Sequence, residues 1–372
     1  ILLDIVPNHC GIEHPWFKAA QADANSETAE FFTFQNHPDD YACWLGVKSL
    51  PKLNYASAKL RGLVYGNPDS IFKTWLREPY QVDGWRIDVA NMLGRQGAVQ
   101  MGEEIGRGIR EAVKSVNPEA YLLGENFFDA SHQLQGQFLD GNMNYSGFMR
   151  PVLSWLMGEK IWNFKNKEWL SSGEPIATSS LVETWLAYLA VIPYDLALQQ
   201  FNILDSHDTE RIQSVMGGNL KLQKLAIALQ FCFPGIPCIY YGDEIGIPGQ
   251  KMDNRQCMPW DPSTWNTGLR GFYQRLINLR KSAPALIHGG FEILAVDENV
   301  IAFIRESKDQ KIIGVFNRGA DLRPYSVRLE QADIPDQRWW IDAFSGQGWQ
   351  VKDGRIDFEI LPTGALILCE SR

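Results

Sequence analysis

Acidic side chains and histidines recur in this sequence directly after short apolar runs. They are Asp4 to His9, Asp88, Glu125 and the pair His207-Asp208. Carboxyl and imidazole groups transfer protons, and carboxylates also attack as nucleophiles. Each residue alone could instead cap a helix. Because so many occupy the same position after an apolar run, the sequence favours a shared catalytic rim over a set of unrelated caps.

A guanidinium accompanies one of these carboxylates. Arg86 lies two residues before Asp88, so on a strand both side chains face the same side. A neighbouring positive charge favours the ionised carboxylate, which is the form a nucleophile needs. The alternative interpretation is a buried ion pair with a purely structural role.

The elements that must position these residues alternate between strands and helices. Apolar runs predict strands at Ile1–Val6, Gly84–Val89, Tyr121–Gly124, Gly141–Tyr145, Asn202–Asp205 and Cys238–Tyr241. Amphipathic patterns predict helices near Pro68–Leu76, Val99–Val116, Leu181–Leu189, Leu220–Phe231 and Leu269–Ser282. This alternation indicates a parallel α/β fold. In a (β/α)8 barrel the carboxyl ends of the strands form the rim that carries the chemistry.

Three stretches depart from that alternation. Residues 10–54 have weak periodicity and predict a subdomain inserted into a catalytic domain at 1–287. Residues 288–372 hold short β-rich segments separated by Gly, Asn, Asp and Pro, which predicts a C-terminal antiparallel β-sandwich domain. The chain opens on a buried-strand pattern without an initiator Met. We therefore expect a fragment of a longer protein whose barrel lacks its first two strands, with exposed parallel edges.

Composition excludes some classes of function. The net charge of −9 argues against a nucleic-acid partner, and no apolar stretch is long enough to span a membrane. The six cysteines are scattered through a long chain, which predicts free thiols in a reducing compartment, the cytoplasm, and no zinc site. The 13 Trp, 12 Tyr and 19 Phe suit the apolar faces of sugar rings, although most aromatic residues serve packing.

Four segments in order resemble the conserved regions of the α-amylase family, glycoside hydrolase family 13. They are DIVPNH (Asp4–His9), GWRIDVAN (Gly84–Asn91), GEN (Gly124–Asn126) and LDSHDT (Leu204–Thr209). A fifth segment, Ser49–Asn54, resembles the subgroup of neopullulanase, cyclomaltodextrinase and maltodextrin glucosidase. The resemblance covers the whole chain.

The resemblance implies cleavage of α-1,4-glucosidic bonds in maltodextrins with retention of configuration. In such enzymes two carboxyl groups roughly 5–5.5 Å apart act on a sugar that passes through an oxocarbenium-like state. By match to the family motifs, Asp88 is the nucleophile, Glu125 the acid/base and Asp208 a third carboxylate that stabilises the transition state.

The resemblance also assigns supporting residues. Substrate contacts are expected from His9, Arg86, His207, Asn91, Arg255 and Trp260, and structural support from Asp4 and Asn8. No cofactor is expected, although some members bind calcium near the position of Asn8. In this subgroup an N-terminal β domain commonly helps to form a homodimer, and that region is not in this sequence.

The leading interpretation is an α-glucosidase like maltodextrin glucosidase, acting on short malto-oligosaccharides. The first alternative is a cyclomaltodextrinase or neopullulanase with transglycosylation. The second is a family relative without catalysis, which the joint presence of the three carboxylates argues against.

Overall fold

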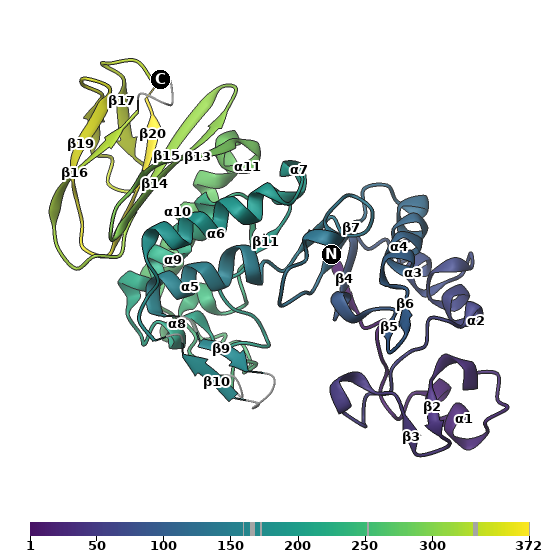
Figure 1. Cartoon of the computed structure of the whole chain (residues 1–372). Coiled ribbons are helices and arrows are strands. Elements are labelled where there is room, and N and C mark those ends of the chain that lie inside the picture. The colour runs from purple at the N-terminus through teal and green to yellow at the C-terminus, as the bar shows by residue number, and fades with distance from the viewer. Residues whose placement is uncertain (159, 164–167, 172, 251–252, 330–333, 372) are drawn as a thin grey trace. The chain divides into compact units, whose positions relative to one another are not determined.

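The computed structural model describes residues 1–371 apart from 159, 164–167, 172, 251–252 and 330–333. The chain forms two compact units, Ile1–Met143 and Asn144–Arg372 (Figure 1). The division falls inside the segment expected to be one catalytic domain, so the domain boundary at 287/288 stays a prediction.

The first unit contains a four-stranded parallel sheet in the order β1-β4-β7-β8. Its strands are β1 (Leu2–Ile5), β4 (Gly84–Ile87), β7 (Tyr121–Gly124) and β8 (Gly141–Asn142). The register pairs Ile5 with Ile87 and Ile87 with Gly124, so three strands end level with one another. The sheet agrees with the strands expected from the sequence, except that β8 ends before the predicted Tyr145.

Helices α2 (Ala58–Arg61), α3 (Ile71–Thr74) and α4 (Gly102–Val116) also belong to the first unit. Helix α4 is amphipathic and buries Ile105, Ile109 and Val113. The sequence predicted a helix from Val99, but β5 (Arg95–Gln96) and β6 (Val99–Gln100) form a hairpin there. Gly97 has a φ of +55°, a left-handed conformation that glycine adopts readily and that suits a tight turn.

The inserted stretch contains more regular structure than its sequence indicated. It holds α1 (Pro15–Ala22), the 3-10 turns Ala29–Phe31 and Trp44–Gly46, and the hairpin of β2 (Phe34–Asn36) and β3 (Asp40–Tyr41). Helix α1 begins after His14, whose side chain accepts a hydrogen bond from the main-chain N–H of Trp16 at 3.2 Å. Because a histidine stands where Ser, Thr, Asp or Asn usually caps a helix, the start signal was not recognised.

The second unit carries a short parallel pair, β11 (Phe201–Asn202) and β12 (Ile236–Pro237). The same unit contains α5 (Arg150–Met157), α6 (Thr178–Ala190), α7 (Tyr194–Ala197), α8 (Ile212–Val215), α9 (Leu220–Cys232), α10 (Thr267–Ser282) and α11 (Pro284–His288), and the antiparallel pair β9 (Lys160–Asn163) and β10 (Glu168–Ser171). Both parallel strands are shorter than predicted and lie nearer the N-terminus. Within the described parts of the chain, none of the helices combines the length and apolar character that crossing a bilayer requires.

The chain ends in two antiparallel sheets, as the sequence predicted. The larger has the order β13-β14-β15-β20-β17-β18 and the smaller pairs β16 with β19. Their strands are β13 (Gly290–Val296), β14 (Val300–Ser307), β15 (Gln310–Asn317), β16 (Arg323–Arg328), β17 (Trp339–Asp342), β18 (Gly348–Gln350), β19 (Arg355–Ile360) and β20 (Gly364–Glu370). Side chains from both sheets share one buried core that includes Trp340, Ile356 and Leu368.

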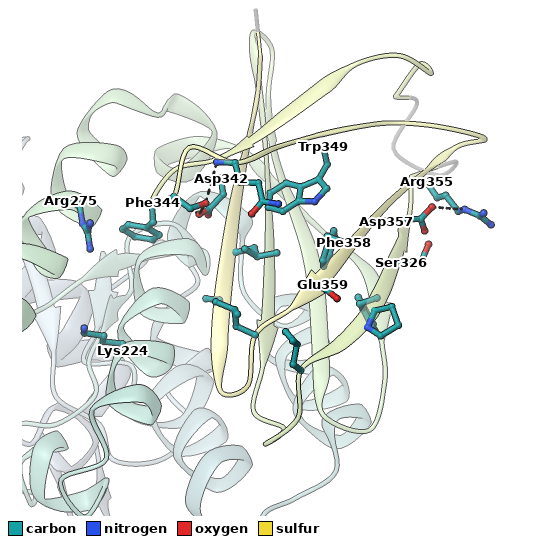
Figure 2. A pocket seen from close by; sticks show the side chains of 18 of the residues that line it. Lys224, Arg275, Ser326, Asp342, Phe344, Trp349, Arg355, Asp357, Phe358 and Glu359 are labelled. Carbon is teal, nitrogen blue, oxygen red and sulfur yellow. Dashed lines mark hydrogen bonds and ion pairs between the residues drawn. The ribbon is translucent and has the colours of Figure 1, made fainter.

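A cavity of about 1150 Å³ opens beside these sheets in the second unit (Figure 2). Phe344, Trp349 and Phe358 contribute aromatic rings to its lining, and Arg355 and Asp357 form an ion pair at its edge. It contains none of the residues that the sequence identified as catalytic or substrate-binding.

Candidate active site

Asp88 and Glu125 directly follow paired residues on neighbouring parallel strands. Ile87 at the end of β4 is in register with Gly124 at the end of β7. The main-chain N–H of Asp88 donates to the carbonyl oxygen of Ile5 at 2.9 Å, and that of Glu125 donates to the carbonyl oxygen of Ile87 at 3.0 Å. Because strand pairing continues into both residues, the sheet fixes their backbones side by side.

Arg86 joins these carboxylates through one guanidinium. Its Nη1 lies 2.8 Å from Asp88 Oδ1 and 2.8 Å from Asp4 Oδ1, and its Nη2 lies 2.8 Å from Glu125 Oε1. The Nη2 contact is an ion pair without hydrogen-bond geometry. The Arg86 side chain is 11% exposed and that of Glu125 is 5% exposed. Burial alone would lower the pKa of Arg86, but Glu125, Asp4 and Asp88 together raise it.

The residue after Asp88 adopts an uncommon backbone conformation. Val89 has φ 49° and ψ 42°, the left-handed region that β-branched residues rarely occupy. Such a conformation costs on the order of 1–3 kcal/mol and persists where the surroundings enforce it, often at functional sites. Here it directs the Val89 N–H at Glu125 Oε2, 2.9 Å away. The turn thus links the two carboxylate-bearing strand ends a second time.

His9 also belongs to the first unit. Asn8, only 1% exposed, donates from Nδ2 to His9 Nδ1 at 3.1 Å, which leaves the imidazole proton on Nε2. The His9 ring stacks on Trp44 with centroids 5.3 Å apart. Burial lowers the pKa of His9, the charge of Asp88 raises it and the charge of Lys52 lowers it further. The structure therefore presents a neutral His9 near Asp88.

Lys52 is a further residue of this site that the sequence did not predict, although it lies inside the family-like segment Ser49–Asn54. It is 5% exposed, and its Nζ donates to the carbonyl of Met92 at 3.1 Å, in the turn that follows Asp88. Burial lowers its pKa to about 8. The main chain of Lys52 also bridges to that of His9. A lysine beside a motif is usually exposed, so only the fold could identify this one.

Replacing Lys52 with methionine should raise the pKa of His9, because the variant removes a positive charge that opposes protonation of the imidazole. An NMR titration of the His9 ring, assigned with a His9→Gln variant, measures the change. The matched control is Lys48→Met, because Lys48 is an exposed lysine of the same inserted stretch. An unchanged or lowered His9 pKa would show that Lys52 does not act on this ring.

The third carboxylate lies in the second unit, in the loop after β11. Asp208 Oδ1 lies 2.8 Å from Arg255 Nη2, and Asp208 Oδ2 lies 3.1 Å from His207 Nε2. The Asp208 N–H donates to Ser206 Oγ at 3.1 Å. The Asp208 carboxylate is therefore held by the side chains of Arg255 and His207, and its main chain is held by Ser206.

The three remaining predicted substrate contacts are Arg255, Trp260 and Asn91. Arg255 binds Asp208 and the carbonyl of His207, so its charge is engaged within the protein although its side chain is 62% exposed. Trp260 is 78% exposed and presents its ring to solvent. Asn91 lies half-buried in the 3-10 turn Ala90–Met92 after Asp88.

Calcium binding stays a prediction. Calcium takes six to eight oxygen ligands. Asn8 Oδ1 is a buried oxygen without a hydrogen-bond partner among the described residues, but one such oxygen falls far short of that number. In the described ranges, no group of three or more His, Cys, Asp or Glu side chains could hold a metal ion.

Comparison with known proteins identifies the family. Residues 1–270 match the model of the alpha amylase catalytic domain. The chain is 30% identical over 377 residues to a cyclomaltodextrinase of Geobacillus thermopakistaniensis, covering 99% of this chain and 58% of that protein. It is 30% identical over 383 residues to neopullulanase 2 of Thermoactinomyces vulgaris, covering 100% of this chain and 60% of that protein. The chain thus spans less than two thirds of the length of these relatives.

Solved structures agree with the sequence comparison. A crystal structure from Thermus thermophilus superposes with a TM-score of 0.87 at 28% identity, covering 100% of this chain and 76% of that one. The four motifs, the strand-end carboxylates and these matches lead to one assignment. The chain belongs to the α-amylase family, with a catalytic domain of the (β/α)8-barrel type followed by a C-terminal sheet domain.

Proposed function

We propose that this protein is a retaining glycoside hydrolase that cleaves α-1,4-glucosidic bonds in short malto-oligosaccharides. The observation that carries the proposal is the shared contact of Arg86 with Asp88 and Glu125, on neighbouring strand ends. A retaining mechanism needs two carboxyl groups close together, one to attack the sugar and one to protonate the leaving group, and the paired strand ends place Asp88 and Glu125 next to each other. A purely structural ion pair would need only one carboxylate, whereas Arg86 serves three.

In the proposed mechanism Asp88 attacks the anomeric carbon while Glu125 protonates the departing glycosidic oxygen. Arg86 holds Asp88 in place for this step through its Nη1, 2.8 Å from Asp88 Oδ1. Water then cleaves the glycosyl–Asp88 ester, and Glu125 takes the proton from that water. The neutral imidazole of His9 donates a hydrogen bond from Nε2 to the sugar. For Asp208 the family resemblance implies the binding of sugar hydroxyls in the transition state. Trp260 is the proposed aromatic surface for a further sugar unit.

A second candidate is activity on cyclodextrins and pullulan, including transglycosylation. The names of the two similar proteins, cyclomaltodextrinase and neopullulanase, favour it. The first candidate, activity like that of maltodextrin glucosidase, rests on the segments WLG (Trp44–Gly46) and PGIPCIYYGDEIG (Pro234–Gly246), which resemble those of maltodextrin glucosidases. Both use the same carboxylates, so the two candidates differ in which substrate is cleaved and not in the chemistry.

Product analysis separates these candidates. The purified protein is incubated with maltotriose, a cyclodextrin and pullulan, and the products are resolved by chromatography. We expect glucose and maltose from maltotriose, faster than products from either larger substrate, and an α-configured product at first release by NMR. A faster rate on the cyclodextrin would identify the second candidate, and a β-configured product would contradict retention. The Asp88→Ala variant is the inactive control.

The cytoplasm is the proposed compartment. All six cysteines are free thiols, and burial raises the pKa of Cys10 to about 12 and that of Cys238 to about 11. Such thiols are unreactive as nucleophiles, and unpaired cysteines are typical of a reducing environment. The proposed partner is the malto-oligosaccharide substrate.

A further inference from the structure

The loop that carries His207 and Asp208 is wrapped around one buried amide. Asn254 is 1% exposed, and its Nδ2 lies 3.2 Å from the carbonyl oxygen of Ser206, 2.8 Å from that of His207 and 2.6 Å from that of Thr209. A primary amide has two N–H donors, so these three acceptors share both of them. The main-chain carbonyls on both sides of Asp208 therefore converge on a single side chain.

The orientation of this amide is fixed by its surroundings. Asn254 Oδ1 is buried and has no hydrogen-bond partner within the described part of the chain. Turning the amide over would break all three hydrogen bonds and would point Oδ1 at the three carbonyl oxygens. The protein thus accepts one unsatisfied acceptor in order to keep the donor toward the loop.

The main chain of Asn254 is held by two further buried or half-buried side chains. Its main-chain carbonyl accepts from Arg211 Nε at 2.9 Å and from the Tyr240 hydroxyl at 3.2 Å. Arg211 is completely buried, donates to the carbonyl of Tyr241 at 2.7 Å and contacts Asp243 at 3.3 Å. A charge held by this many partners cannot move without leaving buried groups unpaired. Arg211 and Tyr240 therefore fix the backbone that carries the Asn254 amide.

We propose that Asn254 is a positioning residue that sets the place of the Asp208 carboxylate through the main chain of residues 206–209. The neighbouring Arg255 contributes the outer half of the same arrangement, because it binds the His207 carbonyl and Asp208 Oδ1. The proposal rests on the role of Asp208 in the proposed function. It assigns to Asn254 an effect on turnover without any contact with substrate.

The test is a double-variant cycle of Asn254→Asp and Asp208→Asn, measured as kcat and KM on maltotriose with melting curves of every variant. Asn254→Asp keeps the shape but places a carboxylate oxygen against three carbonyl oxygens. A misplacement of about 1 Å typically costs about 100-fold in rate, so we expect that loss in kcat with a smaller change in KM. In the double variant, the loss should equal that of Asp208→Asn alone.

The control is Asn219→Asp, an exposed helix cap of α9 where aspartate accepts the same hydrogen bonds. If Asn254→Asp does not fold, Asn254→Ala, which removes the donor without adding charge, takes its place in the cycle. Full activity of the Asn254 variant, or multiplicative losses in the double variant, would overturn the proposal alone. An Asp208→Asn variant as active as the parent would overturn the role of Asp208 as well.

Discussion

Replacing Asp88 with asparagine should lower kcat/KM on maltotriose by at least about 10⁴-fold, which corresponds to about 5.5 kcal/mol of transition-state stabilisation. Asparagine has the shape of aspartate but is a far weaker nucleophile, so the covalent step is lost. Arg86 keeps Asp4 and Glu125 as partners in the variant, so folding should be little affected. Steady-state kinetics and a thermal melt measure the two effects.

The matched control is Asp69→Asn, because Asp69 is an exposed aspartate of the same unit. It should leave both activity and melting temperature unchanged. A loss of less than about 10-fold in a folded Asp88→Asn protein would mean that another group forms the covalent bond. A large loss in both variants would point to a general effect of charge.

The strand-end carboxylates could be predicted because the information is local. An apolar run followed at once by Asp88 or Glu125 predicts a strand and also places the acid at the carboxyl end of that strand, all within a few residues. The same holds for the antiparallel C-terminal sheets, whose apolar segments are separated by turn residues. Short parallel strands such as β11 were misplaced because two paired residues leave almost no periodicity to read.

Arg86 and Asp4 were expected at the site from the sequence, but Lys52 and Asn254 were not, because their contacts span long stretches of sequence. Lys52 reaches Met92 across 40 positions. Asn254 contacts the Asp208 loop across 45 to 48 positions. Nothing in the type of these residues distinguishes them from exposed lysines or loop asparagines. Burial does, and burial is a property of the fold.

Glu125→Gln should separate substrates by their leaving groups. Glutamine cannot donate a proton to the glycosidic oxygen, so we expect a loss of about 10³-fold or more on maltotriose, within the range of general acid catalysis. A nitrophenyl α-glucoside leaves as a stable phenolate and needs no such proton, so its first turnover should persist as a burst. The later hydrolysis should be slow, because the same residue must then act as the base.

Azide provides the decisive measurement. It is an anionic nucleophile that needs no base, so adding it to Glu125→Gln should speed release of the intermediate and yield an α-configured glycosyl azide. The exposed Glu103→Gln in α4 is the matched control and should respond to azide no more than the parent does. Equal losses on both substrates without rescue would remove Glu125 from the acid/base role.

The same variant should also report on the geometry of the site. Glu125 accepts the Val89 N–H on Oε2 and forms an ion pair with Arg86 through Oε1. Glutamine loses the charge and can turn its oxygen toward only one of these two groups. A buried donor left without an acceptor costs about 1–3 kcal/mol. The melting temperature of Glu125→Gln should therefore fall, whereas that of Glu103→Gln should not. Loss of stability together with azide rescue would show that Glu125 is both the acid/base and the side chain that stabilises the left-handed turn at Val89.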